Sequence, residues 1–137
     1  MNALFVDTGA FVARALPRDQ HYRASREGWK TLENVDVKLF SSEHVFDESV
    51  SLLARHAGGD FAVRWAREHL GSQQIVWLNS NREDLHEALR WLENLSDQKI
   101  SFTDSLSFAL MHREAIQHAF GFDHHFERAG FELWPRL

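Results

Sequence analysis

The sequence predicts an α/β fold, in which a central parallel sheet is covered by helices on both faces. Short apolar runs alternate along the chain with longer segments whose apolar residues recur every three or four positions. The first run, residues 3–6, is continuously apolar, which is typical of a strand buried on both faces. The chain has 137 residues and no proline-rich linker, so we expect a single domain over residues 1–137.

Each expected strand is a short apolar run that ends at polar or turn-forming residues. The first ends at Asp7, where Thr8 and Gly9 indicate the start of a helix. The last two runs lie near the end of the chain and are typical of short closing strands. The expected strands cover residues 3–6, 35–40, 74–78, 118–122 and 131–133.

The expected helices are recognised by apolar spacing and by residues that begin or end a helix. Pro17 ends the first, Gly58 ends the third, and the segment from Ser80 to Glu83 has the spacing of a capping box before the fifth. The helices cover residues 10–16, 19–32, 43–56, 60–70, a segment after residue 83, and one that starts between residues 101 and 104. The apolar faces of the last three are expected at Phe61, Trp65 and Leu70, at Leu85, Leu89 and Leu92, and at Leu106, Ala109 and Leu110.

Composition and charge exclude several classes of function. The chain has no cysteine, which excludes disulfides, thiolate zinc sites, iron–sulfur clusters and cysteine nucleophiles. The formal net charge is −5, so binding to nucleic acid requires a local basic patch or bound cations. No apolar run reaches the roughly 20 residues of a membrane span, and the first residues lack a signal-peptide pattern, so we expect a cytoplasmic protein.

Four carboxylates stand at positions where a charge needs an explanation. Asp7 ends the first strand, and Asp123 follows the strand expected at residues 118–122. Asp104 lies in the first turn of a helix, and Glu48 lies on the stripe that its helix is expected to bury. Because the carboxyl ends of parallel strands meet at one edge of a sheet, these four acids are expected to converge there.

Each acid also has an ordinary structural explanation. Aspartate is a preferred N-cap residue, so Asp7 and Asp123 are candidate helix caps, and the Ser101-x-x-Asp104 spacing approximates a capping box. Glu48 has Arg55 on the same helix as a candidate ion-pair partner. Taken together, however, the four acids are more than capping requires.

A cluster of carboxylates at one edge indicates a metal site. Carboxylates that share a cleft repel one another unless they hold protons or a cation neutralises them. Oxygen ligands favour a hard ion, so we expect Mg²⁺ or Mn²⁺ rather than Zn²⁺. Because such ions take phosphate as a further ligand, the cluster favours hydrolysis of a phosphodiester or phosphate ester.

The order of these motifs resembles the PIN-domain ribonucleases, and most closely the VapC-type toxins of toxin–antitoxin pairs. The resemblance rests on Val6-Asp7-Thr8, Glu48, Ser101-x-x-Asp104 and Phe122-Asp123-x-x-Phe126, and it spans nearly the whole chain. It implies a three-layer sandwich with a central parallel sheet of about four to five short strands, a homodimer and a small VapB-like antitoxin. It also implies an Mg²⁺- or Mn²⁺-dependent endoribonuclease.

Carried over by position, the resemblance makes Asp7, Glu48, Asp104 and Asp123 the catalytic, metal-binding acids. Thr8 and Ser101 are the supporting hydroxyls. Many members of the family have threonine or serine two residues before the last acid, where this chain has Gly121. Asp97 is a further acid in the same part of the chain, and the sequence leaves its role open.

Two residues are candidates for contacts with substrate phosphate. Arg14 belongs to a basic cluster near Asp7, although such a cluster is more often a solvated helix face. His124 follows Asp123 directly; because neighbouring helical residues point apart, only one of His124 and His125 can face the site. The other members of the basic cluster are Arg18, Arg23, Arg26 and Lys30.

Three other functions share part of this sequence pattern. The first alternative is a catalytically inactive PIN-like scaffold that binds protein, and the second is a housekeeping RNA-processing nuclease without an antitoxin. Haloacid-dehalogenase-type phosphatases also begin with a strand-end aspartate. They require a second aspartate two residues later, where this chain has Gly9, so that class is disfavoured.

Overall fold

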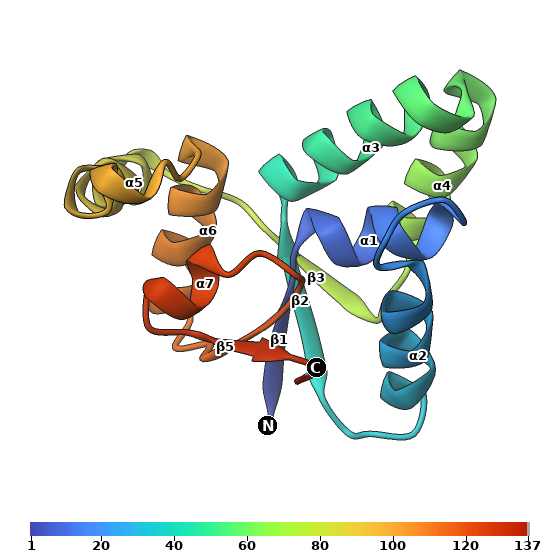
Figure 1. Cartoon of the computed structure of the whole chain (residues 1–137), viewed down its shortest axis with the longest axis horizontal. Helices are drawn as coiled ribbons and strands as arrows, with labels where there is room; N and C mark the ends of the chain where they lie inside the picture. Colours follow the sequence, from blue (N-terminus) through green and yellow to red (C-terminus); the bar gives the residue numbers. More distant parts are fainter. Residues whose placement is uncertain (137) are drawn as a thin grey trace.

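The computed structural model describes residues 1–136 and contains one five-stranded sheet (Figure 1). All neighbouring strands are parallel, which confirms the predicted α/β class. The strands are β1 (Ala3–Val6), β2 (Lys38–Ser42), β3 (Ile75–Leu78), β4 (His118–Phe120) and β5 (Glu132–Trp134).

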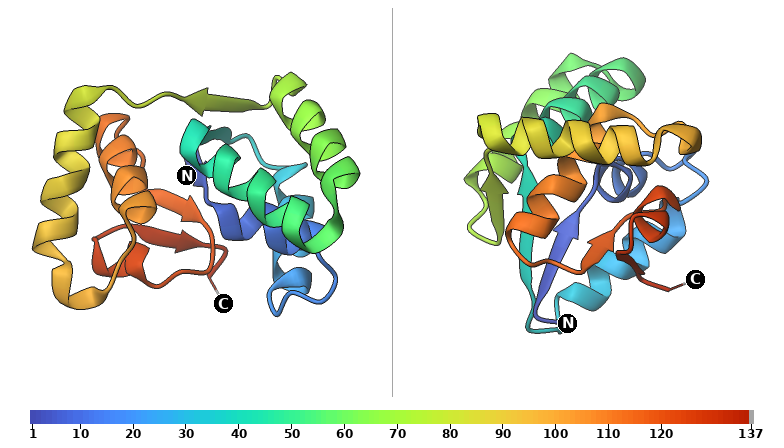
Figure 2. Two further views of the ribbon diagram at one scale, coloured as in Figure 1. Left: turned by 90° about the horizontal axis from the view of Figure 1, so that it is seen from above. Right: turned by 90° about the vertical axis from the view of Figure 1, so that its left-hand side faces the viewer.

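The helices cover both faces of this sheet, as expected. They are α1 (Thr8–Ala15), α2 (Tyr22–Leu32), α3 (Glu43–Ala57), α4 (Gly59–Gly71), α5 (Arg82–Asn94), α6 (Phe102–Arg113) and α7 (His125–Arg128), with a 3₁₀ turn at Ser96–Gln98. Helices α1, α2 and α4 lie to one side of the central strands, and α5, α6 and α7 lie to the other (Figures 1 and 2). Within residues 1–136, no helix has the length and apolar composition to cross a membrane.

The strand order is β3-β2-β1-β4-β5, so β1 is the middle strand and pairs with β2 and β4. Parallel pairing brings the carboxyl ends of all five strands to one edge of the sheet. The residue that follows β1 therefore lies at the centre of that edge. This residue is Asp7.

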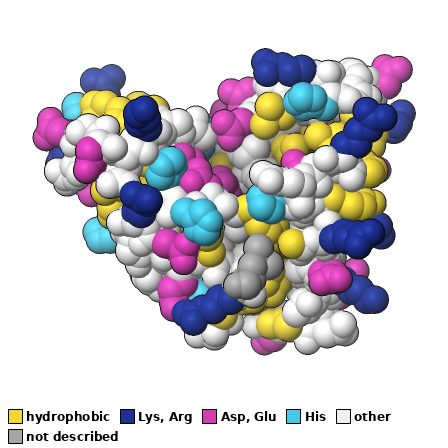
Figure 3. All heavy atoms as spheres, in the orientation of Figure 1, with side chains coloured by type: hydrophobic (Ala, Val, Ile, Leu, Met, Phe, Trp, Pro, Cys, Tyr) yellow, Lys and Arg dark blue, Asp and Glu magenta, His cyan; other side chains and the backbone are white. Residues whose placement is uncertain are grey.

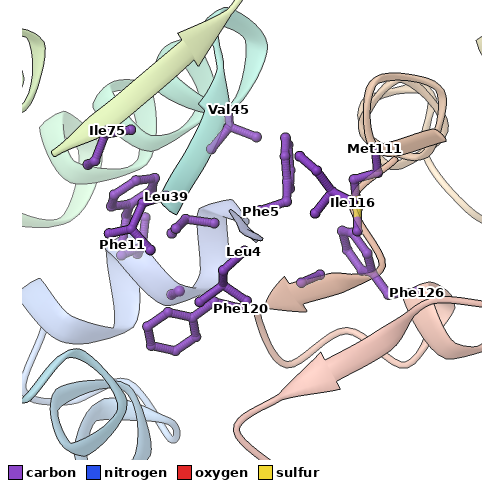
Figure 4. Close-up of a cluster of buried hydrophobic side chains, with 14 of the residues drawn as sticks. Leu4, Phe5, Phe11, Leu39, Val45, Ile75, Met111, Ile116, Phe120 and Phe126 are labelled. Carbon is purple, nitrogen blue, oxygen red and sulfur yellow. The ribbon is translucent and has the colours of Figure 1, made fainter. Parts of the chain in front are cut away.

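The core is built around β1 and fixes the position of its carboxyl end. Leu4 and Phe5 are completely buried, and they lie among side chains from both helical layers (Figure 4). Phe11 of α1 and Phe120 of β4 pack on one side, where both rings lie against Trp29 of α2, while Phe126 of α7 lies on the other. A strand held on both faces in this way is a rigid support for the residue at its end.

Two strands differ from the predicted ranges by at least two residues at one end, whereas β3 and β5 differ by no more than one. β2 begins and ends later than residues 35–40, because two serines extend it. The Ser41 hydroxyl donates to the Val6 carbonyl (2.7 Å), and the Ser42 hydroxyl accepts from the Val45 N–H at the start of α3. β4 ends at Phe120 rather than at residue 122.

The apolar faces expected on two helices are partly wrong. Leu70 at the end of α4 is 57% exposed, and Leu85 and Leu89 of α5 are 41% and 52% exposed. On α5 the buried positions are Asp84 and Ala88 instead. Asp84 faces inward because it completes a capping box: its carboxylate accepts from the Asn81 N–H, and its own N–H donates to the Asn81 side chain. The Asp84 carboxylate also forms an ion pair with Arg113 of α6.

Candidate metal centre

Asp7 occupies the N-cap position of α1, but its side chain forms no capping hydrogen bond of the usual kind, and only the adjacent Thr8 N–H favours its charge. The Asp7 backbone N–H donates to the Phe120 carbonyl (2.9 Å), and this bond continues the β1–β4 pairing beyond the last strand residue. The residue is only 7% exposed. Capping therefore does not explain why an aspartate is buried at this point.

Asp104 and Asp123 approach each other from α6 and from the segment after β4. The Ser101 hydroxyl accepts a hydrogen bond from the Asp104 N–H (3.1 Å), so Ser101 is the N-cap of α6 and orients its first turn. Asp123 accepts from the His125 N–H (2.9 Å), which fixes a tight turn before α7. Single donor atoms of Asp104, Asp123 and His125 lie within 4.8 Å of one another.

Glu48 reaches the same region from α3, but the prediction that it interrupts a buried stripe is wrong. The buried positions of α3 are Val45, Ser49 and Leu53, and Glu48 is exposed. Among residues 1–136 it forms no ion pair with Arg55 either. Its carboxylate is thus free of both structural explanations.

All four acids line one open cleft of about 460 Å³ at the carboxyl edge of the sheet. Figure 3 shows acidic side chains at the base of a notch between the α5 and α3 sides of the molecule. The two hydroxyl residues named by the sequence pattern, Thr8 and Ser101, line the cleft as well. The other lining residues are Gly9, Val12, Asp19, His21, Leu52 and Phe122.

Burial and mutual repulsion make the two central acids reluctant to ionise. Burial, followed by the negative charge of Asp104, raises the pKa of Asp7 to about 8, and the Thr8 N–H offsets only part of this rise. Burial and the neighbouring Asp123 carboxylate raise the pKa of Asp104 to about 6. Near neutral pH the cleft therefore holds protons unless a cation takes their place.

The donor set fits a hard divalent cation. Four carboxylates supply oxygen ligands, which Mg²⁺ and Mn²⁺ prefer. The Thr8 Oγ1 atom is buried and has no hydrogen-bond partner within the described residues, so it is available to a ligand in the cleft. His125 adds one nitrogen, since its Nδ1 lies 3.0 Å from Asp123 Oδ1 and 3.8 Å from Asp104 Oδ2.

Comparison with known proteins agrees with this geometry. Residues 4–132 match the PIN domain, which is more than nine-tenths of the chain. The chain belongs to the PIN-domain family. The positions of Asp7, Asp104 and Asp123 all fall within the matched range, as does that of Glu48.

This PIN domain is similar over nearly its whole length to VapC20, a 23S rRNA-specific endonuclease of Mycobacterium tuberculosis. The identity is 33% over 129 residues, covering 93% of this chain and 95% of VapC20, in both strains CDC 1551 / Oshkosh and H37Rv. The crystal structure of M. tuberculosis VapC20, a sarcin-ricin loop cleaving toxin, superposes with a TM-score of 0.84 at 30% identity, and the match covers 93% of this chain and 95% of that one. VapBC2 from Rickettsia felis, bound to a promoter DNA fragment, shares the fold with a TM-score of 0.71, 12% identity and 96% coverage of both chains.

Arg14 does not line the acidic cleft of this PIN domain. Its guanidinium lies 3.8 Å from the centre of the Trp29 ring, and its Nη2 lies 3.0 Å from His69 Nε2. Burial lowers the pKa of Arg14 to about 10. The side chain thus joins α1 to α2 and α4, and the expectation that it reaches substrate phosphate loses its geometric support.

Of the two neighbouring histidines, the structure brings His125 rather than His124 to the acids. The His124 side chain is 82% exposed and its Nδ1 lies 2.7 Å from Glu127, outside the acidic cleft. His125 lies beside Asp123 and Asp104 instead. The pattern allowed only one of the pair to face the acids, and the turn at Asp123 determines that this residue is His125, while His124 lines an adjoining cleft. A contact between His124 and substrate phosphate stays a prediction.

Three features of this PIN domain's cleft were missed or left open by sequence reasoning. Asp19 and His21 line it from the loop between α1 and α2, where no motif marks them. A Cβ atom at Gly121 would lie 3.1 Å from the Asp7 Cβ. A serine or threonine at this position would therefore crowd Asp7. Asp97 does not line the acidic cleft but an adjoining one.

Proposed function

We propose that this chain cleaves phosphodiester bonds of RNA with Mg²⁺ or Mn²⁺ held by Asp7, Glu48, Asp104 and Asp123. The family assignment makes it a VapC-like PIN endonuclease. The observation that carries the site is the convergence of acids from four separate parts of the chain in one cleft. The raised pKa of Asp7, at about 8, supports a cation there, because a buried aspartate without one is destabilising.

Each residue has a distinct role in the proposed reaction. A divalent cation, when bound, supplies Lewis-acid stabilisation of the charge that develops on the phosphodiester. Asp7 provides the fixed ligand at the end of the central strand, and Asp104 and Asp123 line the same cleft. Thr8 has a free hydroxyl for orienting ligand or substrate oxygen, and Ser101 holds the first turn of α6 in place.

We infer further that the chain acts as a toxin on RNA and is controlled by a small VapB-like antitoxin. The 33% identity to VapC20, a 23S rRNA-specific endonuclease, supports the RNA substrate. The fold shared with VapBC2 supports an antitoxin partner. A single PIN-like domain over residues 1–137 and a homodimer in the cytoplasm complete the proposal.

Cleavage of a synthetic sarcin–ricin stem-loop RNA by the purified protein tests the enzymatic part. We expect cleavage with Mn²⁺ or Mg²⁺, none with EDTA, and a loss of roughly a hundredfold or more in Asp7→Asn and Asp104→Asn. Asp36→Asn, which removes an exposed acid outside the cleft, is the matched control and should cleave normally. Wild-type rates in both cleft variants would refute the site.

Expression in a bacterial host tests the toxin role separately. We expect growth arrest with the wild type and normal growth with Asp7→Asn at equal protein level. Co-expression of the small open reading frame beside the gene should relieve the arrest. Cleavage in vitro without growth arrest would favour a housekeeping RNA-processing nuclease, and no metal-dependent cleavage of any RNA would favour the inactive scaffold.

A further inference from the structure

Among the described residues, no lysine or arginine side chain lines the acidic cleft. A cation bound to the acids can take the phosphate that is cut, but an RNA strand carries a further negative charge at every nucleotide. With a net charge of −5, the molecule has no general positive field to hold these neighbouring phosphates. The strand therefore needs a local group of cations next to the cleft.

A second cleft, of about 430 Å³, adjoins the acidic one and shares Phe122 and Asp123 with it as walls. Lys99 and Arg128 supply its positive charge, and the exposed acid Asp97 also lines it. Neither Lys99 nor Arg128 forms an ion pair within residues 1–136. Arg128 donates to the neutral amide oxygen of Gln98, which orients the guanidinium without cancelling its charge.

An aromatic pair stands where the two clefts meet. The rings of His21 and Phe122 are stacked, with centroids 4.3 Å apart and an interplanar angle of 7°. Both rings line the acidic cleft, and Phe122 also lines the second cleft, which contains Lys99 and Arg128. Stacked rings at the wall of a nucleic-acid cleft are a suitable surface for an unpaired base.

The other basic cluster of the molecule lies elsewhere. Arg23 and Arg26 line a cavity on α2 together with Arg14, and this cavity shares no lining residue with the acidic cleft. An RNA strand that is cut at the acids therefore does not place its next nucleotide against this cluster. The cluster offers the same kind of charge at a different place. It serves as the comparison for the test below.

We propose that Lys99 and Arg128, with the His21–Phe122 ring pair, form a subsite for the nucleotide next to the scissile phosphate. The cations bind its phosphate, and the rings stack on its base. The inference rests on the proposed ribonuclease function and specifies how that site holds its substrate. An RNA whose flanking nucleotide is unpaired fits this subsite, because a base inside a duplex cannot stack on a protein ring.

The first test removes the two charges without shortening the side chains greatly. We expect Lys99→Gln/Arg128→Gln to lower kcat/KM for the stem-loop RNA about tenfold and to reduce its salt dependence, with a log–log slope smaller by about 0.7, because one phosphate contact is lost. Arg23→Gln/Arg26→Gln removes the same charge from α2 and should change neither quantity. An equal or larger loss in the α2 variant would overturn the proposal.

The second test neutralises single phosphates in the RNA. A methylphosphonate on one side of the scissile phosphate, placed 5′ in one substrate and 3′ in another, removes one negative charge. We expect one of the two substrates to be cut about tenfold more slowly by the wild type but no more slowly by Lys99→Gln/Arg128→Gln. Additive losses in the variant would show that these cations do not contact that phosphate.

The third test concerns the rings. Phe122→Leu keeps an apolar side chain but removes the aromatic surface, and Phe122→Tyr retains the ring. We expect an abasic nucleotide at the flanking position to slow the wild type and Phe122→Tyr by about tenfold and to leave Phe122→Leu unchanged. If the abasic substrate slows Phe122→Leu equally, the rings do not bind the base.

These outcomes are distinguishable from failure of the proposed function. If the wild type cuts no RNA with Mn²⁺ or Mg²⁺, the ribonuclease assignment is refuted and the subsite with it. If the wild type cuts RNA and the Lys99, Arg128 and Phe122 variants cut identically, only the subsite is refuted.

Discussion

The buried carboxyl of Asp7 loses its proton only at a raised pH or when a cation binds beside it. It is the most buried of the four acids and follows the middle strand of the sheet. Its pKa of about 8 means that the folded chain keeps a proton on this carboxyl at pH values where an unfolded aspartate, with a pKa near 3.9, has lost it. The ionised form of such a carboxyl is unfavourable without a cation, and a bound cation stabilises it.

The first prediction concerns how the stability of the metal-free protein depends on pH through the Asp7 proton. Because the folded pKa is raised, the contribution of Asp7 to stability is complete below about pH 4 and is lost as the pH rises toward 8. Asp7→Asn has no charge to bury, so we expect its Tm in EDTA to exceed that of the wild type by about 5 °C at pH 8. Thermal unfolding at pH 4 and pH 8 checks this, and a constant difference between the two pH values would contradict it.

Gly121 provides the second prediction. A side chain here would place its Cβ 3.1 Å from the Asp7 Cβ and 3.4 Å from the carboxylate oxygen Oδ2. Rotation about the Asp7 Cα–Cβ bond leaves the Cβ in place, so the backbone at the end of β1 must shift slightly and carry the carboxylate with it. We expect Gly121→Ala to weaken Mn²⁺ affinity roughly tenfold by calorimetric titration.

Gly71→Ala is the matched control for this substitution. No atom lies within 4 Å of the Cβ that it adds at the end of α4, so metal affinity should be unchanged. Equal affinities in wild type and Gly121→Ala would show that Asp7 tolerates a neighbouring side chain.

At the residue scale, the acids were predictable where position alone marks them. Asp7 and Asp104 stand at a strand end and a helix start, and these places can be read from the sequence. Glu48 was misplaced because Ser49, a small polar residue, is buried and takes the position expected of the charge. His125 depends on a hydrogen bond from its own N–H to Asp123, which no spacing rule reveals.

At the scale of elements, one hydrogen bond joins the two helices that carry Glu48 and Asp104. His44 Nε2 of α3 lies 2.9 Å from the Ser107 hydroxyl of α6. Burial lowers the pKa of His44 to about 4, so the ring is neutral at working pH. Glu48 lies one turn after His44, and Asp104 lies one turn before Ser107.

The third prediction follows from this link. We expect His44→Ala to lower the free energy of unfolding by about 1–2 kcal/mol and, beyond that, to weaken Mn²⁺ binding several-fold, because α3 and α6 lose their fixed separation. His56→Ala, at the exposed end of α3, should change neither quantity. A loss of stability with wild-type metal affinity would assign His44 a purely structural role.

The elements were predicted well where apolar pattern and packing agree. β1, α3 and α6 meet that condition, and their expected positions are close to those observed. β2 was placed about three residues early, because Val35 and Val37 look like strand residues while Ser41 and Ser42 do not. Their hydroxyls bond to the neighbouring backbone, and this partnership is visible only in the folded chain.

At the scale of the whole molecule, metal binding and proton release are coupled. The pKa values of Asp7 and Asp104, about 8 and about 6, are raised, so a cation must displace protons from these carboxyls, and the fraction of them that is protonated increases as the pH falls. The fourth prediction is that the rise in Tm caused by Mn²⁺ grows between pH 6 and pH 8. At a hundredfold excess over Kd the gain is about 2.7 kcal/mol.

Thermal unfolding with Mn²⁺ and with EDTA at several pH values measures this coupling. The double variant Asp7→Asn/Asp104→Asn should show no rise in Tm at any pH. A metal-dependent rise of equal size at pH 6 and pH 8 in the wild type would show that the two acids are already ionised in the metal-free protein.

The alternation of strands and helices was sufficient to predict the fold class, and the common edge of parallel strands was sufficient to predict that the acids meet. The strand order β3-β2-β1-β4-β5 was not predictable from local pattern, because it depends on which apolar faces pack together. The adjoining cationic cleft was missed for the same reason, since Lys99 and Arg128 are separated by α6 and β4 in the chain.

The middle position of β1 has a consequence for how the cleft opens. Its neighbours on both sides shield its amides, and the Asp7 N–H is bonded to Phe120, so hydrogen exchange with deuterated solvent should be slowest there. Glu48 and Asp123 stand on segments nearer the surface, where brief local openings are more frequent. The floor of the cleft should therefore persist while its rim relaxes, and ion release would begin at the rim.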